Sequence, residues 1–274
     1  MQTSWPQAIV PGSFPSLRHG RALSVRAGKV TAVTEPLLLL SGSGLPAWVW
    51  DDVRDGLGPS VVAVRPDSPD AGPAEYAAAA LAQVDWPRFT VVAHSVGGVV
   101  AQAVLAAAPE RVAGVLGVAA AWPPAGRAFT AALPAPQRWL LPVLLRLAGT
   151  RPPERAIRGG IGAGLPAGTV DRLVAEFTPE SRRLFVTPVP AGPPPERSGY
   201  VHTAADRELP PALQRRCAAA MGAGFSREVG TGHLPMLEGP GGPPARHRRV
   251  HTCGMTSAAT SRRWSRSDRS STCR

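Results

Sequence analysis

Short apolar runs alternate with longer helical stretches along the middle of the chain. The runs are rich in leucine, valine and alanine, and their length is typical of strands buried in a sheet. They cover residues 36–40, 90–94, 112–119 and 200–206. An alanine-rich stretch of helical character follows the second run directly, over residues 97–107. Strands separated by helices predict an α/β fold with a doubly wound, mostly parallel sheet.

Between residues 122 and 197 the pattern changes, because helical stretches follow one another without a strand between them. Helices are predicted over 137–148 and 169–177. A third is predicted to open at Thr178-Pro179-Glu180, where threonine suits the cap and proline the first turn. We interpret residues 122–197 as a small helical lid, the alternative being a cover for the sheet edge. Four apolar side chains in it are expected to be core more than pocket: Trp139, Leu140, Leu144 and Phe177.

The sequence Ala93-His-Ser95-Val-Gly97 lies where the second run meets the alanine-rich helix. Small residues at Ala93 and Gly97 allow a sharp turn between strand and helix, and such a turn holds the intervening serine exposed and strained. A serine in that position acts as a nucleophile when a base lies within reach. The alternative is a serine that only caps the helix.

An acid and a histidine follow the serine along the chain. Asp206 ends the run 200–206, and His233 lies in a loop after an apolar strand that ends near Val229. The order serine, acid, histidine is the one expected for an acyl-transfer triad on a doubly wound sheet. Taken singly, each residue has an alternative: Asp206 as the cap of the turn toward Leu209-Pro210-Pro211, and His233 as a loop histidine bound to backbone.

The first apolar run leads into the glycine-rich segment Ser41–Pro46. Glycines let backbone N–H groups turn inward, and a tetrahedral acyl intermediate needs two such donors. The candidates are the amides of Ser43 and Val96, the second of which also benefits from the dipole of the following helix. A plain turn between strand and helix is the alternative.

Together these motifs resemble the α/β-hydrolase superfamily, and within it the small serine esterases of the methylesterase and hydroxynitrile-lyase branch. The resemblance covers residues 36–240 and rests also on two segments, Asp206-Arg-Glu-Leu-Pro-Pro-Ala-Leu-Gln214 and His233-Leu-Pro-Met236. It implies Ser95 as nucleophile, His233 as base and Asp206 as orienting acid. It further implies that the amides of Ser43 and Val96 form the oxyanion hole, and that a lid over residues 122–197 covers the nucleophile and sets substrate choice.

Three positions decide between the reactions found on this fold. Members of the branch usually carry a His-Gly pair at the oxyanion loop, where this chain has Ser41-Gly42. Related lyases place a lysine directly after the histidine, where this chain has Leu234, and dehalogenases need an aspartate in place of Ser95. We therefore expect hydrolysis of a small carboxylic ester through an acyl-enzyme intermediate. The alternatives are hydrolysis of a carbon–carbon bond, which uses the same residues, and a non-catalytic ligand-binding protein on the same scaffold.

Composition and charge limit which classes of protein the chain can belong to. The chain has 274 residues, and of its net charge of +11 the segment 241–274 carries +7, from eight arginines and one acid. We interpret 241–274 as a basic disordered tail, with nucleic-acid binding as a less favoured alternative. Residues 1–35 are expected to hold at most a short hairpin. No run is long enough to span a membrane, no secretory signal is visible, and three cysteines form no metal spacing. We expect a cytoplasmic enzyme without cofactor or membrane partner, acting on a small-molecule ester.

Overall fold

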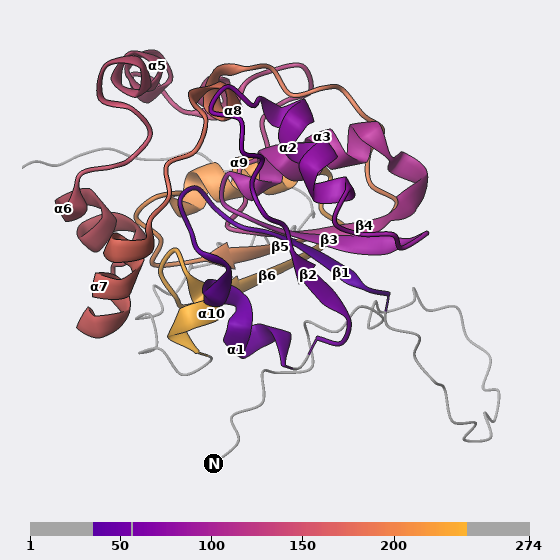
Figure 1. The fold of residues 1–274 in the computed structure, drawn as a ribbon, viewed down its shortest axis with the longest axis horizontal. Helices are drawn as coiled ribbons and strands as arrows, with labels where there is room; N and C mark the ends of the chain where they lie inside the picture. The colour runs from indigo at the N-terminus through magenta and orange to yellow at the C-terminus, as the bar shows by residue number, and fades with distance from the viewer. Residues whose placement is uncertain (1–34, 56, 240–274) are drawn as a thin grey trace, which may run out of the picture.

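The computed structural model describes residues 35–55 and 57–239. Its centre is one sheet in which every strand runs parallel to its neighbours, in the order β2-β1-β3-β4-β5-β6 (Figure 1). The strands are β1 (Leu37–Leu40), β2 (Ser60–Val62), β3 (Phe89–His94), β4 (Val112–Val118), β5 (Ser198–Thr203) and β6 (Phe225–Val229). The predicted α/β fold with a doubly wound parallel sheet is confirmed.

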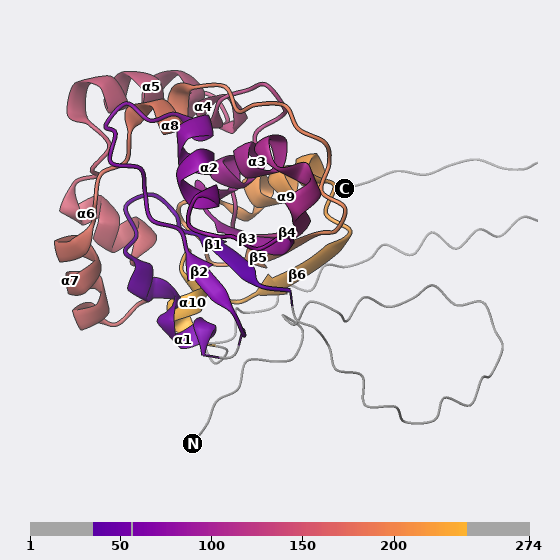
Figure 2. The same ribbon diagram turned by 45° about the vertical axis from the view of Figure 1, so that its right-hand side comes forward.

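Helices cover both faces of this sheet. One face carries α2 (Pro73–Leu81), α3 (Gly97–Ala107) and α9 (Pro211–Met221), and the other carries the short helices α1 (Asp51–Arg54) and α10 (Pro235–Glu238) (Figures 1 and 2). Side chains along β1 alternate between the two layers: Leu38 packs in the first, and Leu39 packs in the second together with Val49 from the 3₁₀ turn η2 (Ala47–Trp50). This alternation follows from the two-residue period of a strand.

Residues 122–197, here called the insertion, contain only helices and connecting segments, and all of them are described. The helices are α4 (Phe129–Ala132), α5 (Gln137–Ala148), α6 (Glu154–Ala156), the π-helical turn η4 (Ile157–Ile161), α7 (Ala167–Glu176) and α8 (Arg182–Val186). They gather on the side toward which β5 and β6 point (Figure 1). The predicted helices over 137–148 and 169–177 correspond to α5 and α7.

The predicted start of the third helix is wrong. Helix α8 begins at Arg182, and its cap is Ser181, whose hydroxyl accepts a hydrogen bond from the Arg183 N–H at 3.1 Å. Thr178 lies in extended chain instead, and its N–H donates to the Gly44 carbonyl at 3.1 Å. A long-range backbone hydrogen bond therefore overrides the local capping preference of the threonine.

The expectation that three apolar residues of α5 are core is also wrong. Trp139, Leu140 and Leu144 are 61%, 55% and 56% exposed, whereas Phe177 is buried as expected. Helix α5 lies at the outside of the insertion, where it packs on α4 and α8 from one side only (Figure 2). One side of the helix therefore packs against the protein through Leu145. The opposite side carries the exposed apolar residues, and no element within the described part of the chain covers it.

Two expectations fall outside the described residues: the hairpin within 1–35, of which only Glu35 is described, and the tail over 241–274. The described part of the chain has no helix that is both long and apolar enough to cross a bilayer. Of the three cysteines, Cys217 is described, and its side chain is buried and free.

Adjacent leucines of α5 test this placement. Leu145→Ala is expected to lower the free energy of unfolding by about 2–5 kcal/mol, because it opens a cavity in the core. Leu144→Ala is expected to change it by about 0.5 kcal/mol or less, because that side chain is mostly exposed. Urea denaturation of the two variants measures the difference, and equal losses would contradict the orientation of the helix.

Candidate active site

Ser95 lies in the turn that joins β3 to α3, with a backbone φ of 54°. A positive φ is uncommon for any residue other than glycine, and such strain persists only where surrounding structure enforces it. Here the Ser95 carbonyl accepts hydrogen bonds from Ala121 N–H at 2.8 Å and Gly98 N–H at 3.1 Å. The turn thus holds Ser95 at the carboxyl end of the central strands.

The turn requires glycine at two positions on its helical side. A Cβ added to Gly97 would lie 2.5 Å from the Leu40 carbonyl oxygen, and one added to Gly98 would lie 2.2 Å from the Ala121 carbonyl oxygen. Both obstacles are backbone atoms, which cannot move aside cheaply. The sequence pattern identified Gly97 but not Gly98, although the two glycines are adjacent in the motif.

The structure brings Ser95, His233 and Asp206 together in one line of hydrogen bonds. His233 Nε2 lies 3.1 Å from Ser95 Oγ, and His233 Nδ1 lies 2.8 Å from Asp206 Oδ2. The three residues follow β3, β6 and β5, whose carboxyl ends meet at one edge of a parallel sheet. Ser95 therefore has a base within reach, and its side chain makes no capping bond to α3.

Asp206 both orients His233 and caps a turn, so the two functions considered for it coexist. Its Oδ1 accepts from the N–H groups of Glu208 and Leu209 at 2.8 and 2.9 Å, while its Oδ2 accepts from the Thr203 hydroxyl at 2.8 Å. Burial acts to raise the pKa of this carboxyl, but the hydrogen bonds and the attraction to His233 outweigh burial and hold the pKa below its usual value. Asp206 is therefore ionised at neutral pH.

Gln214 on α9 fixes the position of Asp206 and was not singled out as a functional residue from the sequence. The side chain is fully buried; its Oε1 accepts from the Thr203 N–H at 2.9 Å, and its Nε2 contacts the Leu209 carbonyl at 2.6 Å and Asp206 Oδ2 at 3.3 Å. The sequence did contain a signal for this residue, because Gln214 is the last residue of the segment 206–214 that carries the family resemblance.

His94, the residue before the serine, supports His233 from the other side. His94 Nε2 lies 2.8 Å from the His233 carbonyl oxygen, and because a carbonyl only accepts, Nε2 carries the proton. Burial, and then the proximity of His233, lower the pKa of His94 to about 3, so the ring is neutral. Its Nδ1 has no hydrogen-bond partner among the described residues and lies beside Gly42, where a Cβ would approach it to 2.8 Å.

The backbone amides of Ser43 and Val96 are free to bind an anion. Neither N–H donates a hydrogen bond to another group within residues 35–55 and 57–239. Val96 directly precedes α3, so the positive end of that helix dipole lies at its amide. In the oxyanion loop itself, the Ser41 hydroxyl accepts from Trp50 Nε1 at 2.9 Å. That bond ties the start of the loop to η2.

A cavity of about 640 Å³ lies next to the oxyanion loop and the turn at Ser95. Its lining is mainly apolar and comes from the loop, from residues 62–69, from α2, from α3 and from the insertion; it includes Leu45, Val96, Val100, Pro179 and Leu184. The cavity has room for a small apolar group beside Val96; Ser43 and Ser95 are not among the residues that line it. Within the described residues no cluster of histidine, cysteine and acidic side chains is suited to hold a metal ion.

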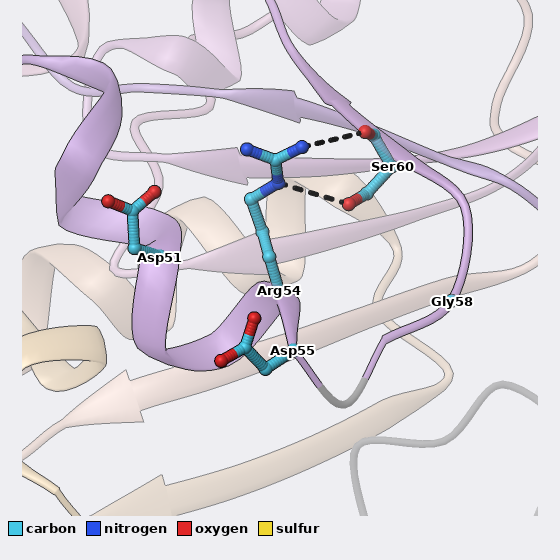
Figure 3. Close-up of a pocket in the computed structure, with 5 residues that line it drawn as sticks. All are labelled: Asp51, Arg54, Asp55, Gly58 and Ser60. Carbon is cyan, nitrogen blue, oxygen red and sulfur yellow. Dashed lines mark hydrogen bonds between the residues drawn. The ribbon is translucent and has the colours of Figure 1, made fainter.

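A second hollow, of about 360 Å³, lies near the start of β2 and is polar (Figure 3). Asp51, Arg54 and Asp55 line it together with Gly58 and Ser60. The Arg54 guanidinium donates to both the hydroxyl and the carbonyl of Ser60, at 3.2 Å each. This hollow shares no lining residue with the larger cavity, and its arginine already has partners within the chain.

Comparisons with known proteins agree with the fold. A family model described as the alpha/beta hydrolase family matches residues 37–243. Among solved structures, an extracellular α/β-hydrolase from a Paenibacillus species gives a TM-score of 0.63 at 17% identity, covering 74% of this chain and 93% of its own. A methylesterase from Arabidopsis gives 0.59 at 16% identity, covering 75% and 94%, and a pyrethroid hydrolase from Sphingobium faniae gives 0.54 at 20%, covering 76% and 93%. At such identities the likeness shows a shared fold. No curated protein sequence matches the chain significantly.

His94 makes the stability of the protein dependent on pH. Its pKa is about 3 when folded and about 6.5 when unfolded, so the unfolded chain binds the additional proton between these values. The contribution of His94 to stability is thus complete above pH 6.5 and falls by about 1.4 kcal/mol per pH unit below it. Between pH 6.5 and 5, native protein should lose about 2 kcal/mol more than the His94→Gln variant. Parallel stability curves from denaturant titrations would contradict the neutral buried state.

Proposed function

Because the chain belongs to the alpha/beta hydrolase family, we propose that it is a serine hydrolase that cleaves a small carboxylic ester through an acyl-enzyme intermediate. One observation carries the proposal: Ser95, His233 and Asp206 form an unbroken hydrogen-bonded series that starts at a strained turn. Such a series is the arrangement that activates a serine for acyl transfer.

In the acylation step, Ser95 Oγ attacks the carbonyl carbon of the ester while His233 Nε2 takes up the hydroxyl proton. The carbonyl oxygen becomes an oxyanion, which accepts hydrogen bonds from the amides of Ser43 and Val96. His233 then gives its proton to the leaving alcohol. Asp206 keeps the imidazole in the tautomer that has its proton on Nδ1 and stabilises the imidazolium while it exists.

In the deacylation step, water replaces the alcohol. His233 removes a proton from the water as it attacks the acyl-enzyme, and the same two amides stabilise the second oxyanion. Collapse of that intermediate returns the proton to Ser95 Oγ and releases the carboxylic acid. No group beyond the side chains and amides described is required for either step.

Two kinds of observation favour an ester over other substrates of this chemistry. The solved structures that share the fold include proteins named as a methylesterase and as a polyneuridine aldehyde esterase. The residue after His233 is the fully buried Leu234, so no cation lies there to hold a cyanide leaving group. The cavity beside Val96 suits a small apolar acyl or alcohol group, and we propose that the insertion acts as a lid that sets its size.

Short p-nitrophenyl esters test the proposal. Purified protein should hydrolyse them, and Ser95→Ala should lower turnover by about 10⁴-fold or more, because the nucleophile is lost. Ser226→Ala is the matched control: its hydroxyl is exposed on β6 and contacts His202, which is not part of the site, so turnover should stay close to that of native protein. Equal turnover in native protein and Ser95→Ala would refute the nucleophile.

A fluorophosphonate probe separates catalysis from binding. The probe reacts covalently with an activated serine, so it should label native protein and leave Ser95→Ala unlabelled. A well-folded native protein that takes up no label would instead support a non-catalytic ligand-binding function. Assay of a small 1,3-diketone alongside the esters tests hydrolysis of a carbon–carbon bond, which uses the same residues.

A further inference from the structure

The insertion forms hydrogen bonds with Gly44 in the glycine-rich segment Ser41–Pro46, here called the oxyanion loop. Gly44, next to the donor Ser43, has both of its backbone groups engaged by the stretch 177–180. Its N–H donates to Glu180 Oε1 at 3.0 Å, and its carbonyl accepts from the Thr178 N–H at 3.1 Å. The chain at Gly44 is thus bound on two sides, much as a strand is bound by a neighbour.

No residue with a side chain fits at the position of Gly44. Its φ is +74°, a conformation that favours glycine, and a Cβ placed on it would lie 2.0 Å from the ring of Phe177. The aromatic ring therefore closes the third side of the residue. Arg151 donates to the Phe177 carbonyl and thereby anchors this stretch of the insertion.

Glu180 is a buried carboxylate with a complete set of partners. Oε1 forms an ion pair with Arg65 in addition to its bond with Gly44, and Oε2 accepts from the Tyr76 hydroxyl at 2.6 Å. Arg65 in turn donates to the Leu45 carbonyl at 2.8 Å, so it holds the next residue of the loop as well. A carboxylate removed from water is tolerable only when such partners surround it.

We propose that Glu180 is a positioning residue for the oxyanion hole: its bond to the Gly44 N–H fixes the Ser43–Gly44 peptide, which restricts the backbone torsions of Ser43 and thereby the direction of the Ser43 N–H. The inference rests on the proposed esterase function. The insertion then has a second function besides covering the site: residues 177–180 hold the oxyanion loop in its conformation. This function also explains how the loop is held although Ser41 stands where related proteins usually carry histidine.

Kinetics of three single variants test the positioning. Glu180→Ala should lower kcat for a short p-nitrophenyl ester by about 100-fold, the size of effect expected when an oxyanion donor is lost. KM should stay within about threefold, because the donor acts mainly in the transition state. Glu180→Gln keeps a carbonyl acceptor for Gly44 and should recover most of the rate. Thr150→Val is the matched control, because it removes a 2.6 Å bond to the Glu180 carbonyl and leaves Gly44 untouched.

A second measurement follows the loop directly. Amide hydrogen exchange in a peptide covering residues 41–47 should become faster in Glu180→Ala and stay unchanged in Thr150→Val. If Glu180→Ala does not fold because Arg65 is left unpaired, the double variant Glu180→Leu with Arg65→Met replaces the pair by apolar side chains and should show the same loss of kcat.

The proposal is overturned if kcat is unchanged in folded Glu180→Ala or in the folded double variant, if Thr150→Val loses as much, or if exchange in the loop does not change in Glu180→Ala. Failure of the esterase proposal gives a different result. Native protein would then neither hydrolyse esters nor react with the fluorophosphonate, and the positioning of a catalytic donor would fall with it. In that case the exchange experiment still decides whether Glu180 holds the loop.

Discussion

The strained turn at Ser95 is the constraint on which the rest of the site depends. A left-handed backbone at a serine costs about 1–3 kcal/mol and must be enforced by its surroundings. Neighbouring backbone enforces the conformation by packing closely against the turn. Gly97 lies against the end of β1 and Gly98 against the segment after β4, and carbonyl oxygens occupy the space that side chains would otherwise fill. These contacts place the oxyanion loop, the serine and the start of α3 within one rigid unit. The positions of both free amides follow from that unit.

His233 comes from a different part of the chain, so its position depends on a buried polar network. Ser95 and Asp206 bind its two ring nitrogens, and His94 binds its carbonyl, which leaves the residue little freedom. Gln214 and Thr203 complete the set of bonds around Asp206. In a low-dielectric interior such a network specifies one arrangement, because any unpaired member would be costly. His94 Nδ1 is the exception, and a neutral ring limits its cost.

The insertion and the sheet meet at Gly44, which connects the cover of the site to its chemistry. In many enzymes a covering segment controls access and water content. Here residues 177–180 also bind the loop that carries one proposed oxyanion donor, so displacement of the insertion would disturb both functions together. Thr178, Pro179 and Glu180 also line the cavity beside Val96. In the proposed esterase, both substrate size and the geometry of the donors would therefore depend on this short stretch of chain.

Local pattern in the sequence determined the strands β1, β3, β4, β5 and β6, the helices α3, α5 and α7, the turn at Ser95 and the order of the three site residues. It did not predict β2, α2 or α9. Strand and helix periodicity and the small residues of the turn are short-range properties, which a sequence displays directly. Tertiary structure alone decided what depends on distant contacts. Trp139, Leu140 and Leu144 are exposed because α5 packs against the protein on one side only. Tertiary structure also moved a helix start from Thr178 to Ser181 and gave Glu180 its place at Gly44, because residues far apart in sequence satisfy one another's backbone groups only once the chain has folded.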